Sequence, residues 1–97
     1  MIKLKGTSFY QDNINNISNT CVGILTPEVD NEFDENAMAL FVNNLKVGYL
    51  QKDWMYEPWS LKVIKTIKLR EGLVSLYKLN SYKENHYTGL RLVFRSV

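Results

Sequence analysis

Short apolar runs separated by turn-forming residues make up most of the chain. Residues 2–6 alternate apolar and basic side chains, which predicts a short strand half exposed to water. An Asn-rich polar stretch then runs to about Thr20 and is interpreted as a long loop. Residues 21–25 form a compact apolar run closed by Pro27 and the acidic stretch 30–35. This pattern predicts a second strand followed by a structured loop.

The clearest hairpin signal lies in the middle of the chain. Residues 37–42 are apolar almost throughout, and an apolar run resumes over residues 46–50. Between them stand Asn43 and Asn44, which tolerate the positive backbone φ of a tight turn. The next segment, residues 51–60, mixes aromatic and acidic side chains and predicts one or two helical turns before a proline interrupts them.

The last third of the chain is predicted to be mostly strand. Apolar and polar residues alternate over residues 61–70, which predicts a strand half exposed to water. The alternation is reversed at Ile64 and Lys65, which is also compatible with the start of a helix. A Glu-Gly pair then turns the chain into two further β-rich runs, residues 73–79 and 88–97. Six short strands with little helix predict an all-β fold with minor helix, either a small barrel or a strongly curved sheet. A closed barrel would also remove exposed strand edges.

Length and composition bound the class of protein. A chain of 97 residues is expected to form one domain, residues 1–97, because a second hydrophobic core needs more chain. The lone Cys21 cannot form an internal disulfide, and the first residues lack the apolar core of a secretion signal. No run approaches the roughly 18 apolar residues of a membrane span. We therefore expect a cytoplasmic protein with no membrane partner.

Charge is distributed unevenly along the chain. Residues 1–59 carry eight acidic and four basic side chains, a net charge of −4, whereas residues 60–97 carry eight basic and two acidic ones, a net charge of +6. Such asymmetry favours a polyanionic partner. Lysines that merely solvate the outer faces of strands explain the same pattern equally well.

The most specific motif spans the acidic stretch and the hairpin. The first half of the motif reads Asn, any residue, an aromatic, Asp, any residue, Asn and Ala, and it is followed directly by an apolar strand. After a turn, the second half is a strand that reads Val, Gly, an aromatic and Leu, with a basic residue beyond it. This pattern resembles the central signature of HIRAN domains. The resemblance extends upstream to the Gly and aromatic pair of residues 6–10 and more weakly downstream to residues 87–88. The matching central positions are Asn31, Phe33, Asp34, Asn36, Ala37, Val47, Gly48, Tyr49, Leu50 and Lys52.

The resemblance to HIRAN domains implies a small OB-like six-stranded β-barrel. It also implies a non-catalytic module that captures single-stranded DNA, above all 3′ ends, in a DNA repair, replication or phage context. HIRAN domains occur attached to helicase-like translocases and nucleases, so a helicase or nuclease is a further implied partner. Two positions depart from the family pattern. Val29 stands where a proline is usual, and Ser8 stands where the best-known DNA-binding members carry an Arg before the aromatic pair.

The candidate DNA-binding residues combine this resemblance with the chemistry of single strands. Aromatic rings stack on unpaired bases, at ~1–3 kcal/mol for each base. A lysine supplies charge for a phosphate, and a carboxylate accepts a hydrogen bond from a terminal 3′ hydroxyl while repelling a phosphate at the same place. The candidate set is Phe9, Tyr10, Phe33, Asp34, Lys52 and Tyr87.

These residues also have purely structural interpretations. Aromatic side chains in so small a protein belong mostly to the core, and Trp54 and Trp59 favour lid or core positions over base stacking. Asp34 and Asn36 equally suit a turn in which side chains accept hydrogen bonds from the loop backbone. Gly48 suits close backbone packing or a bend of the barrel. The alternative function is a protein-interaction module on the same fold without DNA binding.

No residue pattern supports catalysis, a metal or another cofactor. The acidic stretch 30–35 lacks the glycine and the bidentate glutamate that a calcium loop places at fixed positions. A metal-dependent nuclease would need more ligands than this stretch and the lone His86 offer. Cys21 opens an apolar strand and lacks the electropositive surroundings of a nucleophile. We expect a protein that is not an enzyme and needs no cofactor.

Overall fold

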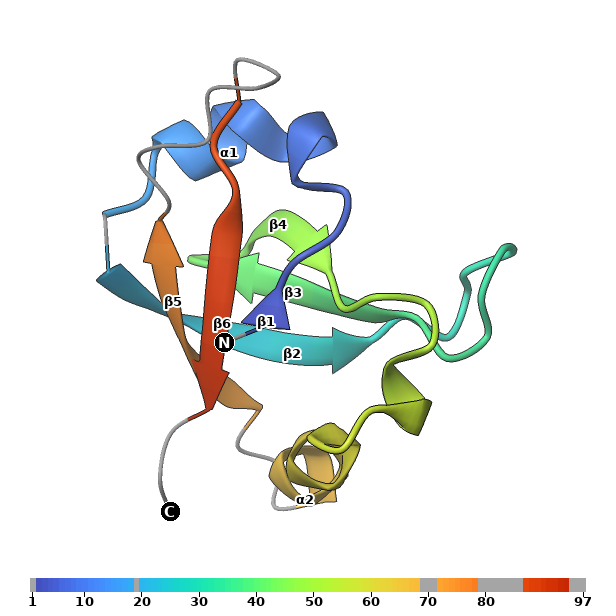
Figure 1. The fold of residues 1–97 in the computed structure, drawn as a ribbon. Coiled ribbons are helices and arrows are strands. Elements are labelled where there is room, and N and C mark those ends of the chain that lie inside the picture. Colours follow the sequence, from blue (N-terminus) through green and yellow to red (C-terminus); the bar gives the residue numbers. More distant parts are fainter. Residues whose placement is uncertain (1, 19, 69–71, 79–86, 95–97) are drawn as a thin grey trace.

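An antiparallel sheet that curls on itself organises the molecule. The computed structural model describes residues 2–18, 20–68, 72–78 and 87–94. In this part of the chain no helix has the length and apolar character needed to cross a membrane. The elements, in chain order, are β1 (Ile2–Lys3), η1 (Thr7–Tyr10), α1 (Gln11–Asn15), β2 (Thr20–Pro27), β3 (Met38–Val42), β4 (Leu45–Tyr49), η2 (Trp54–Tyr56), α2 (Ser60–Lys68), β5 (Leu73–Lys78) and β6 (Leu90–Phe94), and Figure 1 shows their arrangement.

The sheet has six strands in the order β1-β6-β5-β2-β3-β4, and all neighbours are antiparallel. Its two edges meet, because Lys5, just after β1, forms a bridge with Tyr49 of β4. The Lys5 N–H donates to the Tyr49 carbonyl at 2.8 Å, and the Tyr49 N–H donates to the Lys5 carbonyl at 2.9 Å. The expected small OB-like all-β fold is therefore confirmed, with the closure that its edges require.

Gly48 makes this closure possible. A Cβ atom at Gly48 would lie 3.0 Å from the Lys5 carbonyl oxygen and 3.3 Å from Thr7 Cγ2. Only a residue without a side chain lets the backbone of β4 approach the β1 segment this closely. The close packing predicted for Gly48 is confirmed.

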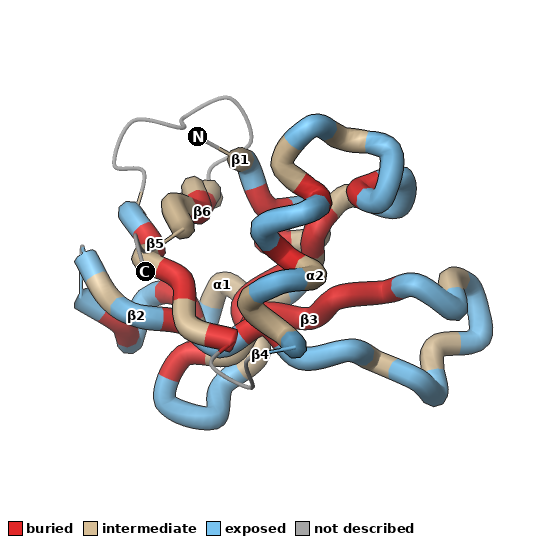
Figure 2. Tube along the Cα trace, turned by 90° about the horizontal axis from the view of Figure 1, so that it is seen from below, coloured by how far each residue is buried: buried red, intermediate tan, exposed pale blue. Residues whose placement is uncertain are grey.

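The core lies inside the curl of the sheet. Side chains of alternate strand residues point inward, and Leu40, Val47, Leu76 and Leu92 have no exposed surface. The helical segments η1 and α1 lie across one end of the curl and α2 lies across the other (Figure 1). Figure 2 shows the buried residues gathered along the strands, whereas the β2–β3 connection extends away from the body and is mostly exposed. Burial of this apolar surface is the main source of stability.

The hairpin prediction is confirmed and carries an irregularity. β3 and β4 are joined by Asn43 and Asn44, whose φ angles are 52° and 65°. The register shifts between Leu40, which pairs with Gly48, and Phe41, which pairs with Lys46. Val47 is thus an extra residue on β4, a β-bulge that changes which face the following side chains occupy.

The predicted long loop before β2 is wrong, because residues 7–15 are helical. Phe9 N–H donates to the Gly6 carbonyl at 3.0 Å, and α1 follows directly. Tyr10, Ile14 and Ile17 bury their side chains fully or partly against the core. Their spacing of four and then three residues is the helical period, which the polar asparagines between them concealed.

The strand predicted over residues 61–70 is wrong for residues 61–68, because α2 occupies residues 60–68. Residues 69 and 70 lie outside the described residues. Ser60 and Val63 are buried, and Ile64 and Ile67 pack partly against the core. These positions follow the i, i+3, i+4, i+7 pattern of one helix face. The reversed polarity at Ile64 and Lys65 therefore reflected the helical period, and the alternation of the surrounding residues did not reflect a strand.

Gly48→Ala should destabilise the fold, since the new methyl group meets a backbone carbonyl that cannot move without opening the barrel. The expected loss is about 1–3 kcal/mol in the free energy of unfolding, measured by urea denaturation. Asn44→Gly in the same hairpin is the matched control, because glycine adopts its positive φ freely and should change stability by less than about 0.5 kcal/mol. Equal stability of Gly48→Ala and the wild type would contradict the close-approach argument.

Candidate functional site

A groove lies between the β2–β3 connection and the segment that follows β4. We call it the loop groove; it encloses about 430 Å³, within the roughly 300–1,000 Å³ typical of ligand sites. Phe33 and Tyr56 border it with side chains that are 88% and 89% exposed. Exposed aromatic side chains that border a groove are candidates for contact with a ligand. The lining residues are Phe33, Asp34, Glu35, Asn36, Lys52, Asp53, Met55 and Tyr56.

Asn31 shapes the loop that carries Phe33 and Asp34. Its Oδ1 accepts hydrogen bonds from the Phe33 N–H at 2.8 Å and the Asp34 N–H at 2.9 Å. The Asp34 Oδ1 in turn accepts from the Asn36 N–H at 3.0 Å. The structural interpretation of Asp34 as a turn residue is therefore correct for one carboxylate oxygen. Within the described part of the chain its Oδ2 has no hydrogen bond, so that oxygen can accept one from a ligand.

The far end of the loop is held by Trp54. Its indole Nε1–H donates to the Asn36 carbonyl at 2.7 Å, and its side chain is buried in the core. The Glu28 N–H donates to the Ala37 carbonyl at 2.9 Å and closes the base of the loop. The expectation that Trp54 belongs to the core is confirmed, and its polar edge orders the loop.

A charged network anchors the near end of the loop. Lys46 Nζ lies 2.7 Å from Glu28 Oε2, and the Tyr49 hydroxyl donates to Glu28 Oε1 at 2.9 Å. The Asn31 Nδ2 also donates to Glu28 Oε1, at 3.1 Å. Glu28 therefore connects strand β4 to the residue that shapes the Phe33–Asp34 turn.

The network shifts the pKa values of its members. Hydrogen bonding from Lys46, followed by that from Tyr49 and Asn31, lowers the pKa of the Glu28 carboxyl below its ordinary value. Glu28 and Tyr49 hold the pKa of the Lys46 ammonium above its ordinary value, because their hydrogen bonds stabilise the charged form. Burial raises the pKa of the Tyr49 phenol. All three groups thus keep their ordinary ionisation near neutral pH.

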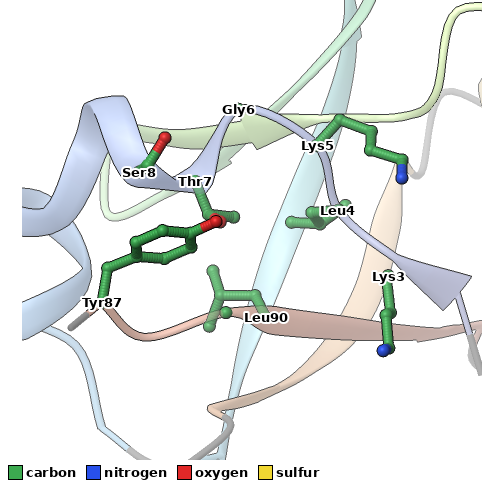
Figure 3. Close-up of a pocket in the computed structure, with 9 residues that line it drawn as sticks. Lys3, Leu4, Lys5, Gly6, Thr7, Ser8, Tyr87 and Leu90 are labelled. Atoms are coloured by element: carbon green, nitrogen blue, oxygen red, sulfur yellow. The ribbon is translucent and has the colours of Figure 1, made fainter. Parts of the chain in front are cut away.

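A second hollow lies beside β1, and we call it the β1–β6 pocket; it encloses about 200 Å³. Figure 3 shows Tyr87 extending its ring beneath Thr7 and Ser8, with its hydroxyl toward Leu4. The side chains of Lys3 and Lys5 lie at the opposite end of the pocket (Figure 3). Tyr87 thus joins a basic pocket that is separate from the loop groove.

Gln11 holds Tyr87 in place. Its Nε2 donates to the Thr88 carbonyl at 3.0 Å, and its Oε1 accepts from the Thr88 N–H at 2.8 Å. The same Nε2 donates to the Thr7 carbonyl at 2.9 Å. The Gln11 amide thus makes the two hydrogen bonds to the Thr88 backbone that a neighbouring strand would make. It joins the segment before β6 to the η1–α1 segment.

The remaining candidates, Phe9 and Tyr10, lie on η1. The Phe9 ring is 85% exposed, so it is available to a ligand. Tyr10 is half-buried, and its ring centroid lies 6.3 Å from that of Tyr49. A shallow surface lined by Ser8 and these two aromatics adjoins the β1–β6 pocket through Ser8.

The structure therefore brings Phe33, Asp34 and Lys52 together in the loop groove and leaves Phe9, Tyr10 and Tyr87 near the β1–β6 pocket. Sequence reasoning missed several residues that border or support these sites. Tyr56 gave no signal beyond its aromatic character, while Asn31 and Tyr49 belonged to the recognised motif without an assigned role. The missed residues are Gln11, Glu28, Asn31, Lys46, Tyr49 and Tyr56.

The acidic loop and Cys21 show no arrangement typical of catalysis. No group of three or more His, Cys, Asp or Glu side chains among residues 2–18, 20–68, 72–78 and 87–94 is placed to hold a metal ion. Burial raises the pKa of the Cys21 thiol, which disfavours the nucleophilic thiolate. His86 lies outside the described residues.

Comparisons with protein-family models, with curated proteins and with solved structures find no match to this chain.

Glu28→Gln should loosen the loop and change the pH dependence of stability. Because the pKa of Glu28 is lowered on folding, its stabilising effect is present above the ordinary value of 4.5 and is lost as the pH falls through the lower folded pKa. The variant should be less stable by about 1 kcal/mol at neutral pH, and this deficit should shrink on acidification. Urea unfolding over a pH series measures both effects.

Glu32→Gln is the matched control, because Glu32 is exposed on the same loop and makes no side-chain hydrogen bond within the described part of the chain. It should leave both stability and its pH dependence unchanged. If the two variants respond alike, Glu28 does not anchor the loop.

Proposed function

We propose that this protein is a non-catalytic module that binds single-stranded DNA and captures a 3′ end in the loop groove. The observation that carries the proposal is the convergence of Phe33, Asp34 and Lys52 on one groove. The motif that resembles HIRAN domains assigns these residue types to DNA binding. Tyr56 adds a second exposed ring at the same groove. Two rings on one groove suit an unstacked base, which has two faces.

The charge of the groove favours the end of a strand over its interior. Asp34, Glu35 and Asp53 line it together with a single cation, Lys52. A continuous sugar–phosphate backbone would bring phosphates against these carboxylates and be repelled. A terminal deoxynucleoside presents only its uncharged 3′ hydroxyl there, and this group can donate to the unused Oδ2 of Asp34. Lys52 would then meet the phosphate on the 5′ side.

The first test is the binding of short single-stranded DNA over a range of salt concentrations. With ~2–4 phosphates engaged, the slope of log affinity against log salt should be about −1.5 to −3. Fluorescence anisotropy of a 5′-labelled oligonucleotide measures it, so that the 3′ end stays free. Absence of binding at low salt would refute the proposal.

The second test is Asp34→Asn, which separates the two roles of this residue. The amide oxygen still accepts the Asn36 N–H and preserves the turn, while the charge that rejects a phosphate is removed. Affinity for a free 3′ hydroxyl should fall about 10-fold, as for the loss of a charge-assisted hydrogen bond. Affinity for a 3′-phosphorylated strand should hold or rise.

Glu35→Gln provides the matched control, since it removes a neighbouring charge from the same groove without touching the Asn36 turn. It should relieve part of the repulsion of the 3′-phosphorylated strand and leave the affinity for the free 3′ hydroxyl unchanged, so that the preference for the hydroxyl is reduced but kept. Equal losses for both ends in Asp34→Asn, on protein with an unchanged circular dichroism spectrum, would exclude Asp34 from the site.

A second candidate function is a protein-interaction module on the same fold. The specific observation in its favour is that exposed Val29, Phe33, Met55 and Tyr56 lie on or near an acidic groove. Apolar surface with negative charge also suits a peptide that carries basic and aromatic side chains. Under this alternative, salt-dependent binding of single-stranded DNA should be absent.

A further inference from the structure

The two walls of the loop groove are joined by one side chain. Trp54 is the first residue of η2, and its indole Nε1–H donates to the Asn36 carbonyl on the opposite wall at 2.7 Å. The Tyr56 N–H donates to the Asp53 carbonyl at 3.0 Å and closes the η2 turn. Trp54 is buried, so both walls are attached to the core. The groove is therefore formed before a ligand arrives, and its side chains are in place to select one.

Each wall of the groove presents an exposed ring beside a carboxylate. Phe33 and Asp34 are consecutive on the β2–β3 connection. On the other wall Asp53 and Tyr56 are three residues apart, and side chains at this spacing project from the same side of a 3₁₀ turn. Both are exposed and line the groove, whereas Trp54 between them is buried. A base that stacks on the Tyr56 ring is therefore placed to present one edge to Asp53.

The Asp53 carboxylate is not used by the fold. Among the residues that the structure describes it makes no ion pair, and it gives η2 no side-chain capping hydrogen bond. Asp34 differs, because one of its oxygens accepts from the Asn36 N–H and fixes the turn. Both oxygens of Asp53 are thus available to a ligand. An ionised carboxylate only accepts hydrogen bonds, so the ligand must supply the donors.

A pair of acceptor oxygens distinguishes the four bases. Guanine presents two adjacent donors, N1–H and N2–H, which match the two oxygens of a carboxylate as a bidentate pair. Adenine and cytosine each present one amino donor beside a ring nitrogen that accepts, and thymine presents one N3–H between two carbonyl oxygens. A carboxylate repels an acceptor placed opposite it. Among the four bases, guanine is therefore the one most complementary to Asp53.

We propose that Asp53 makes the loop groove selective for guanine at the 3′ end of the strand. The guanine stacks between Phe33 and Tyr56, and its N1–H and N2–H donate to the two oxygens of Asp53. The 3′ hydroxyl donates to Asp34 on the opposite wall, so base and sugar are recognised by different carboxylates. The inference rests on the proposed capture of a 3′ end and deepens it, because it names the terminal nucleotide.

The test is a competition among strands of about four nucleotides that differ only in the 3′-terminal base. Fluorescence anisotropy of a 5′-labelled reference strand measures it. A strand that ends in guanine should bind about 10-fold more tightly than one that ends in adenine, a purine with a similar stacking surface. A strand that ends in deoxyinosine keeps N1–H but lacks the amino group of guanine, so its affinity should lie between the two. Equal affinities of the wild type for all three strands would overturn the proposal.

Asp53→Asn removes the charge and replaces one acceptor by a donor, while no side-chain hydrogen bond of η2 is lost. The preference for guanine over adenine should fall to within about twofold, and the affinity for adenine should hold or rise. Glu35→Gln is the matched control, because it removes a neighbouring charge from the same groove. It should keep the guanine preference. The role of Asp53 is overturned if Asp53→Asn, with an unchanged circular dichroism spectrum, retains the preference, or if Glu35→Gln loses it equally.

Base preference and end preference are separate measurements on the same protein. End preference compares a 3′ hydroxyl with a 3′ phosphate on strands that end in the same base. A wild-type protein that prefers the hydroxyl but binds all bases alike refutes guanine selectivity and supports the end site. One that prefers terminal guanine with either end group supports the base site and refutes end selection by Asp34. A protein that binds no strand at low salt overturns both proposals.

Discussion

The closure between Lys5 and Tyr49 is the constraint on which the remaining geometry depends. Two backbone hydrogen bonds join the edges of the sheet there, and they form only because Gly48 lets the two backbones approach. The closure brings the β1 segment and the η1 turn beside β4. It also gives the β1–β6 pocket one of its walls, since Lys5 and Gly6 line that pocket.

The bulge at Val47 places two residues of β4 on the same face, where they support the loop groove. Lys46 and Tyr49 are three residues apart on one strand, and regular alternation would send their side chains to opposite faces. The extra residue restores them to the same face, where Lys46 Nζ lies 3.0 Å from the Tyr49 hydroxyl and both contact Glu28. Through Asn31, Glu28 then orders the turn of Phe33 and Asp34. The shape of the loop groove thus depends on the bulge in β4, through the hydrogen bonds that join β4 to Glu28 and Asn31.

Charge is separated in space as well as along the chain. Among the described residues most acidic side chains lie on the β2–β3 connection and around the loop groove, whereas the charged residues of strands β1, β5 and β6 are Lys3, Lys78 and Arg91. In Figure 1 the connection projects on one side of the sheet and β5 and β6 lie on the other. A polyanion would be repelled from the first region and attracted to the second. The repulsion in the first region is the physical reason for assigning the end of a strand, and not its backbone, to the groove.

The sequence alone was sufficient to predict the features that depend on residues close together in the chain. Asn43-Asn44 between two apolar runs was sufficient for the hairpin, and the order Asn-x-Phe-Asp placed Phe33 and Asp34 in a loop directly before a strand. The helices of residues 7–15 and 60–68 were missed because a few apolar side chains fit both periods, and only packing against a core selects one of them. Tertiary structure alone decided the closure at Gly48, the bulge at Val47 and the pairing of Lys3, Arg91 and Tyr77 across β1, β6 and β5. These features join residues far apart in the chain, and the pairing of strands that are distant in sequence determines which of them become neighbours.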